Sequence, residues 1–101
     1  MIDFAVIAEP TRRQILELLR RGERPVGELV TQLGVSQPTV SKHLRVLRDG
    51  GFVASRVDRQ RRVYRVRTEP LQDIDAWLAP FRAMWSSHLD QLEQHLDRSY
   101  P

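Results

Sequence analysis

The sequence VGELVTQLGVSQPTVSKHLRVLRDGG, residues 26–51, contains two helical patterns joined by a short turn. Apolar residues recur at three- and four-residue steps up to Leu33, and Gly34 follows where a helix end favours left-handed backbone. The second helix is expected to begin at Ser36, whose side chain can accept a backbone N–H, and to end near Arg48. The stretch therefore predicts a helix-turn-helix.

The second of these helices has two chemically different faces. Val40, Leu44 and Leu47 form one narrow apolar stripe at helical spacing. The rest of its surface has short polar donors and cations, with a histidine at the flank: Gln37, Thr39, Ser41, Lys42, His43 and Arg45. Base edges and phosphates require this mixture of donors and positive charge. We therefore expect this helix to lie in a DNA groove.

Length and composition limit the remaining possibilities. A chain of 101 residues predicts one domain, and its small core would gain from a partner subunit. The absence of cysteine excludes disulfides and thiolate metal sites. The start of the chain has Asp3 and no basic region, which argues against a signal peptide. Because the apolar run 4–8 is too short to span a membrane, we expect a soluble, cytoplasmic protein.

Charge is unevenly distributed along the chain. The formal net charge is +3, but residues 1–68 contain 14 Lys and Arg against 7 Asp and Glu. Residues 69–101 contain 2 against 6. A basic front and an acidic tail indicate a polyanionic partner for the front only. A charged surface that only contacts solvent would show the same balance of basic and acidic residues. The predicted helix-turn-helix favours a nucleic-acid partner over that alternative.

The region before the helix pair is expected to be helical as well. Residues 3–9 predict a short apolar helix. Thr11 and Gln14 fit a capping box, so a second helix should begin at Thr11 and end at Gly22. Its arginines could contact phosphate or simply solubilise the surface. Residues 23–25 are expected to be a linker.

The region after the helix pair predicts a basic β-hairpin. Residues 52–57 and 62–67 are two β-prone runs, and the polar residues 58–61 lie between them. Six arginines accompany a single acid, Asp58, and arginine suits phosphates and narrow minor grooves. We therefore expect a wing that contacts nucleic acid. The six are Arg56, Arg59, Arg61, Arg62, Arg65 and Arg67.

The C-terminal region has a long apolar stripe. Apolar residues recur at three- and four-residue steps from Leu71 to Leu96, and Pro80 should kink or divide the helix into 70–79 and 80–97. This stripe is too long and too aromatic for the small core, so we expect a homodimer interface, with folding back onto the domain as the alternative. Trp77 and Trp85 either fill that interface or line a ligand pocket. The candidate interface residues are Phe4, Ile74, Trp77, Leu78, Phe81, Trp85, Leu89 and Leu92.

This order of elements resembles the ArsR-type (ArsR/SmtB) family of bacterial winged-helix repressors. The resemblance depends on FAVIAEPTRRQIL at 4–16, VGEL at 26–29 and, most specifically, SQPTVSKHL at 36–44. It implies a mainly α winged helix-turn-helix domain over residues 1–101 with a small β-hairpin. Within it lie the helix-turn-helix (26–51), the wing (52–68) and C-terminal dimerisation helices (69–98).

The resemblance also implies a function. A homodimer would bind a pseudo-palindromic, double-stranded operator and repress by blocking the promoter. The helix from Ser36 would enter the major groove, flanked by the hairpin from Arg56 to Arg62. The candidate DNA-contacting residues are Gln37, Thr39, Ser41, Lys42, His43, Arg45, Arg56, Arg59, Arg61 and Arg62.

Many members of that family sense metals, but the ligands are incomplete here. The helix before the recognition helix has no thiol. The family's C-terminal pattern is matched by Asp75 and His88 but not by Trp77 and Gln91, and two ligands do not close a zinc site. We therefore expect no metal site and no cofactor, with regulation by abundance or by an unknown small-molecule effector. A zinc- or nickel-type sensor using His88 and His95 is the alternative.

Other classes of protein fit less well. An enzyme is not expected, because no paired-carboxylate site and no glycine-rich phosphate loop is present. A winged-helix module that binds other proteins is a further alternative. The arginine-rich hairpin and the donor-rich helix argue against it.

Overall fold

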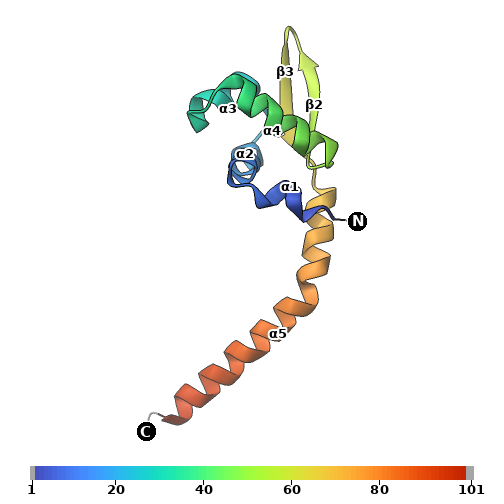
Figure 1. Ribbon diagram of the computed structural model, residues 1–101. Coiled ribbons are helices and arrows are strands. Elements are labelled where there is room, and N and C mark those ends of the chain that lie inside the picture. The colour runs from blue at the N-terminus through green and yellow to red at the C-terminus, as the bar shows by residue number, and fades with distance from the viewer. Residues whose placement is uncertain (1, 100–101) are drawn as a thin grey trace. The chain divides into compact units, whose positions relative to one another are not determined.

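The computed structural model describes residues 2–99, and side chains as far as residue 95. Two compact units are present, one extending to Leu71, hereafter the body, and one beginning at Gln72. The elements are α1 (Phe4–Ala8), α2 (Pro10–Arg20), β1 (Arg24–Pro25), α3 (Val26–Leu33), α4 (Gln37–Asp49), β2 (Val53–Asp58), β3 (Arg61–Val66) and α5 (Glu69–Ser99) (Figure 1).

The predicted helix-turn-helix is present as α3 and α4. Gly34 has the left-handed backbone that ends α3, with φ 69°, and its N–H donates to the Val30 carbonyl at 3.0 Å. The Ser36 hydroxyl accepts the Thr39 N–H at 3.4 Å, which caps α4. Both local signals therefore act as the sequence predicts.

The core of the body is built on the apolar stripe of α4. Val40, Leu44 and Leu47 are buried, as their spacing predicts. They share the core with residues of five other helices and strands and of the turn before β2. The other buried apolar residues are Val6, Ile15, Leu19, Leu29, Phe52, Val53, Val63 and Tyr64. Burying this stripe leaves most of the other side chains of α4 exposed.

Replacing Val40 by alanine should destabilise the protein by about 2 kcal/mol, because two buried methyl groups are lost and a cavity remains. Val40 is 0% exposed. Urea denaturation followed by circular dichroism measures the effect. Val57→Ala is the matched control, since Val57 is 64% exposed and should change stability by less than about 0.5 kcal/mol. Equal effects of the two variants would contradict this view of the core.

The start of α2 differs from the prediction. The helix begins at Pro10, and the carboxylate of Glu9 caps it by accepting the Arg12 N–H at 3.0 Å. The capping box of Thr11 and Gln14 is wrong, because Thr11 already lies inside the helix. Proline suits the first helical position and keeps the preceding residue extended, which makes Glu9 the capping residue.

Two arginines of α2 hold the short helix α1. Arg12 donates to the carbonyls of Ala5 and Val6, at 3.3 and 2.5 Å. Arg13 donates to the next two carbonyls, at 2.8 and 2.9 Å. The last carbonyls of a helix have no partner within it, so these side chains replace the missing hydrogen bonds. Arg12 and Arg13 therefore have a structural role that the sequence left open.

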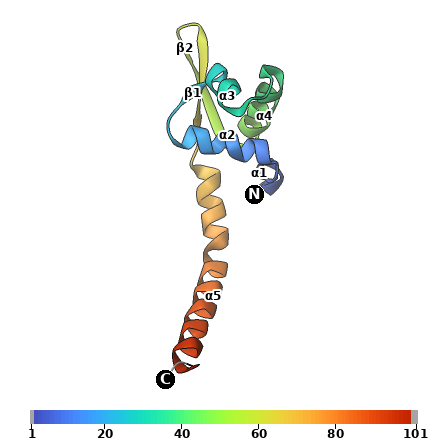
Figure 2. The same cartoon turned by 90° about the vertical axis from the view of Figure 1, so that its left-hand side faces the viewer.

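The wing belongs to a three-stranded antiparallel sheet in the order β1-β3-β2. The predicted linker 23–25 therefore contributes a short strand, β1, which pairs with β3. Both hairpin strands lie one residue nearer the tip than predicted, and Arg59 in the two-residue turn has φ 61°. Figures 1 and 2 both show β2 and β3 projecting together from the helices of the body.

Helix α5 is continuous from Glu69 to Ser99, so of the two outcomes expected at Pro80, a kink or a division, the division is wrong. Proline removes one N–H donor, and here the carbonyl left without its helical partner belongs to the exposed residue Ala76. Water can satisfy that carbonyl, which allows the helix to continue. Leu96 and the last residues of the predicted segment have side chains outside the described part. Among the residues that the structure describes, no helix is both long and apolar enough to cross a membrane.

Candidate nucleic-acid interface

The polar residues predicted on α4 are exposed. Those residues are Gln37, Thr39, Ser41, Lys42 and Arg45. The Thr39 hydroxyl lies 2.8 Å from the Ser36 hydroxyl, so it shares the capping hydrogen bonds of α4. The other four side chains extend from a helix whose opposite stripe is fixed in the core. A rigid helix of this kind can present hydrogen-bond donors and acceptors at defined positions.

His43 is placed differently from these residues. Its side chain is only 16% exposed, and Nδ1 lies 3.4 Å from Arg12 Nη1 and 3.7 Å from a carboxylate oxygen of Glu9. Removal from water pushes the pKa of Glu9 upward, yet the backbone N–H groups of Arg12 and Thr11 and the nearby His43 hold it below its usual value. His43 thus connects α4 to the start of α2, in addition to lying at the flank of the exposed face.

The six wing arginines do not have equivalent surroundings. Arg56, in the middle of β2, makes a two-pronged ion pair with Glu23: Nε donates to one carboxylate oxygen at 3.2 Å, and Nη2 donates to the other. The hydrogen bonds from Arg56 hold the pKa of the Glu23 carboxyl below its usual value, and Glu23 raises the pKa of Arg56. The positive charge of Arg56 is therefore already opposed within the protein.

The arginines at the tip are less constrained. Arg61 lies 3.7 Å from the Asp58 carboxylate, and Arg62 donates to the Ser55 hydroxyl at 3.1 Å. Within the described part of the chain, Arg59 has no ion pair or side-chain hydrogen bond, and it occupies the turn. The tip thus projects three guanidinium groups, and none of them is held by a two-pronged ion pair like that of Arg56.

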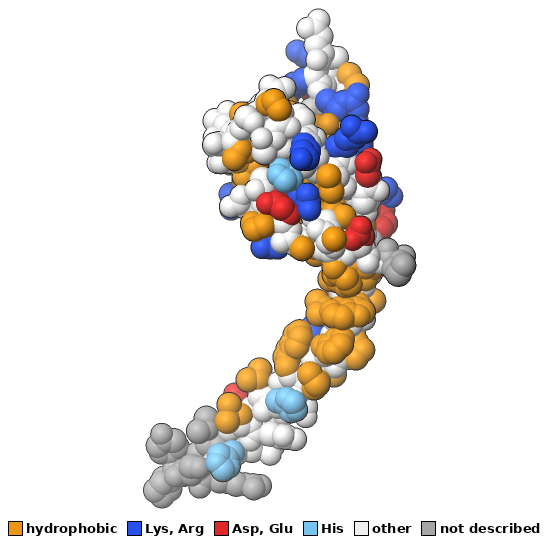
Figure 3. Space-filling view, in the orientation of Figure 1, with side chains coloured by type: hydrophobic (Ala, Val, Ile, Leu, Met, Phe, Trp, Pro, Cys, Tyr) orange, Lys and Arg blue, Asp and Glu red, His pale blue; other side chains and the backbone are white. Residues whose placement is uncertain are grey.

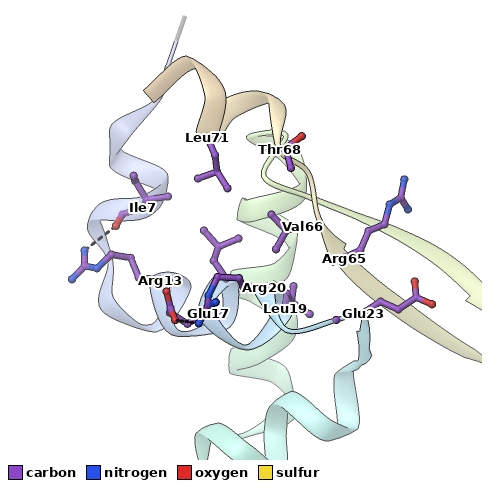
Figure 4. Close-up of a pocket in the computed structure, with 12 residues that line it drawn as sticks. Ile7, Arg13, Glu17, Leu19, Arg20, Glu23, Arg65, Val66, Thr68 and Leu71 are labelled. Atoms are coloured by element: carbon purple, nitrogen blue, oxygen red, sulfur yellow. Dashed lines mark hydrogen bonds and ion pairs between the residues drawn. The ribbon is translucent and has the colours of Figure 1, made fainter. Parts of the chain in front are cut away.

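A separate hollow lies on the body near the start of α5. It has a volume of about 760 Å³ and a mainly apolar lining. Figure 4 shows Ile7, Val66 and Leu71 turned toward the hollow, with Glu17 and Arg20 paired at its edge. Across the described residues, no cluster of three or more His, Cys, Asp or Glu could hold a metal ion. The hollow therefore offers mainly apolar surface.

Comparison with known proteins identifies the family. A sequence profile described as "Bacterial regulatory protein, arsR family" matches residues 9–55. The "Transcriptional repressor SdpR" of Bacillus subtilis (strain 168) is 33% identical, over 77% of this chain and 87% of that protein. The chain belongs to the ArsR family. The "HTH-type transcriptional regulator Rv2034" of Mycobacterium tuberculosis is 38% identical, over 93% of this chain and 85% of its own length.

A solved structure agrees with these relatives. The "ArsR family transcriptional regulator, RHA00566" superposes with a TM-score of 0.72 at 32% identity, covering 82% of this chain and 91% of that one. The winged helix-turn-helix predicted from the sequence is thus confirmed, and this ArsR-family protein is a DNA-binding transcriptional regulator. The family profile ends at residue 55, before the arginines of the wing tip, so the family match does not extend to them.

Proposed function

We propose that this protein is a transcriptional repressor that binds a pseudo-palindromic operator as a homodimer. The proposal rests on one observation above all: the exposed polar and cationic face of α4 and the arginine-rich tip of the β2–β3 wing belong to the same body. In this proposal α4 lies in the major groove and reads base edges through Gln37 and Ser41. Lys42, Arg45 and the tip arginines contact the phosphates.

The homodimer is supported by the surface of α5. Six large apolar residues along this helix are each between 42% and 58% exposed, and Figure 3 shows hydrophobic side chains covering much of it. The Trp77 and Phe81 rings already contact each other, with centroids 4.9 Å apart. An apolar stripe of this length is unfavourable in water and suits an isologous contact between two copies. The six are Trp77, Phe81, Met84, Trp85, Leu89 and Leu92.

The operator follows from this symmetry. Two copies related by a two-fold axis would place their α4 helices about 34–36 Å apart, which matches successive major grooves on one face of DNA. Binding at that position would exclude RNA polymerase from an overlapping promoter. Footprinting of the purified protein on genomic DNA tests the proposal. We expect protected sites with two inverted half-sites at this spacing, and protection of single half-sites only would overturn the dimeric part.

We further propose that this repressor acts without a metal ion. The chain has no cysteine, and Trp77 and Gln91 occupy positions where the family's C-terminal metal site requires ligands. Asp75, which would belong to such a site, is instead paired with Arg82 at 2.7 Å. Control by protein abundance or by a small-molecule effector is consistent with these features.

Single alanine substitutions at Gln37 or Ser41 should change which base is preferred at one position of each half-site. Loss of the contact should reduce discrimination there by about 1–3 kcal/mol. Binding titrations on the matched duplex and on duplexes with single base changes measure it. Gln32→Ala, at an exposed position of α3, is the control and should leave the preference unchanged. Equal loss on every duplex would refute the assignment of these residues to base reading.

A further inference from the structure

The Glu23–Arg56 ion pair spans the central strand of the sheet. Glu23 precedes β1, Arg56 lies in β2, and β3 runs between these two strands. Pro25 and Arg56 are both in register with Val63, so one row crosses the sheet from β1 to β2. The pair joins the two outer strands beside this row. Any role of this pair in DNA recognition rests on the proposed DNA binding.

This row is the last point, toward the tip, at which β1 supports the wing. The pairing of β1 with β3 is limited to Arg24 with Tyr64 and Pro25 with Val63. Beyond it only β2 and β3 continue, and Val57, the next residue of β2, is 64% exposed. The projecting tip therefore begins just beyond the row in which Arg56 contacts Glu23.

The chemistry of the contact also separates Arg56 from the tip. Two parallel N–H···O bonds from a guanidinium to a carboxylate fix both distance and orientation. A phosphate could bind Arg56 only by displacing Glu23, whose carboxylate is also near the positive charge of Arg65. Arg59 has no such competitor among the described residues. Arg56 is thus less available to DNA than Arg59 at the tip.

We propose that Glu23 and Arg56 together position the wing, and that Arg56 supports the DNA interface without contacting phosphate. Glu23 is then a functional residue of a DNA-binding protein despite its negative charge. The tip arginines keep the direct phosphate contacts. The sequence predicted that Arg56 contacts DNA directly, whereas in this proposal Arg56 only supports the DNA interface.

The decisive experiment compares operator affinity and its salt dependence in four variants: Glu23→Gln, Arg56→Gln, Arg56→Glu and the exchange Glu23→Arg with Arg56→Glu. Glu23→Gln and Arg56→Gln should each weaken binding about three- to fivefold on every duplex, the range that a surface ion pair permits. They change the net charge in opposite directions, so a long-range charge effect cannot weaken both. The slope of log affinity against log salt should stay at the wild-type value.

The exchange variant should recover affinity to within about twofold of wild type, because the ion pair is restored with its direction reversed. Arg56→Glu alone should bind more weakly than Arg56→Gln, since two carboxylates would then face each other. Tighter binding by Glu23→Gln, or an exchange variant no better than Arg56→Glu, would identify Arg56 as a phosphate contact and overturn the proposal. Unchanged affinity in both single variants would also overturn it.

Amide hydrogen exchange of the free protein tests the same positioning without DNA. The amides of residues 57–62 should exchange faster in Glu23→Gln than in wild type, because the wing is held less firmly. If these amides exchange faster in Glu23→Gln but the wild-type protein binds no DNA, the proposed function fails and the positioning of the wing by Glu23 stands. If the exchange of these amides is unchanged but Arg59→Gln weakens DNA binding, the positioning of the wing by Glu23 fails and the proposed function stands.

Discussion

Replacing Phe81 and Trp85 together by aspartate is expected to convert the protein to monomers and to weaken operator binding by about 10²–10⁴-fold. Both side chains lie on α5 and are exposed, at 42% and 46%. In a dimer each charge would have to leave water against an apolar partner surface, which is strongly unfavourable. A monomer would bind one half-site only and would lose the gain that comes from engaging two sites at once.

Sedimentation velocity and operator titration measure the two parts of this prediction. Ser86→Asp with Ser87→Asp is the matched control, because it adds the same charge to neighbouring exposed positions outside the apolar stripe. The control should remain dimeric and bind normally. Dimers that persist in the Phe81/Trp85 variant would show that another surface joins the subunits, and circular dichroism establishes that the body of each variant stays folded.

The features that the sequence predicts well depend on residues close together in the chain. The helix-turn-helix follows from Gly34, Ser36 and an apolar stripe with a period of three to four residues. Each of these signals acts within about one helical turn, so no knowledge of tertiary contacts is needed. Once the buried stripe of α4 is known, the side chains on its other face are expected to be exposed.

Two local predictions fail because another local rule is stronger. Thr11 and Gln14 match a capping box, but Pro10 is itself suited to the first helical turn and moves the cap to Glu9. Pro80 matches a helix break, but its position on an exposed side of a long helix lets water replace the lost hydrogen bond. Pattern alone does not decide between such rules.

The remaining features depend on residues far apart in the chain. Strand β1 has two residues, too few for a recognisable alternation, and it exists because β3 pairs with it. Glu23 and Arg56 are 33 positions apart, and Arg12 and His43 are 31 apart. The abundance of arginine predicts a basic wing, but only the folded structure distinguishes the arginine held by Glu23 from those at the tip.

A second large loss of DNA affinity is therefore expected when the tip arginines, and not Arg56, are replaced. Replacing Arg59, Arg61 and Arg62 by glutamine should weaken binding to all duplexes by about 10²-fold near 0.15 M salt. Each arginine that neutralises a phosphate releases counterions, so the slope of log affinity against log salt should become shallower by about 0.9 per substitution. Specificity should hardly change, because phosphate contacts fix register without identifying bases.

Operator titrations at salt concentrations from about 0.05 to 0.3 M define this slope. They are repeated for variants with one, two and three of the substitutions. The charge-matched control replaces Arg20 and Arg21, which are exposed at the end of α2 and directly after it, and is compared with the Arg59/Arg62 double variant. If only net charge mattered, the two doubles would lose affinity equally. A shallower slope confined to the tip variant would instead require local phosphate contacts, and it would separate the tip arginines from Arg56, whose replacement should leave the slope unchanged.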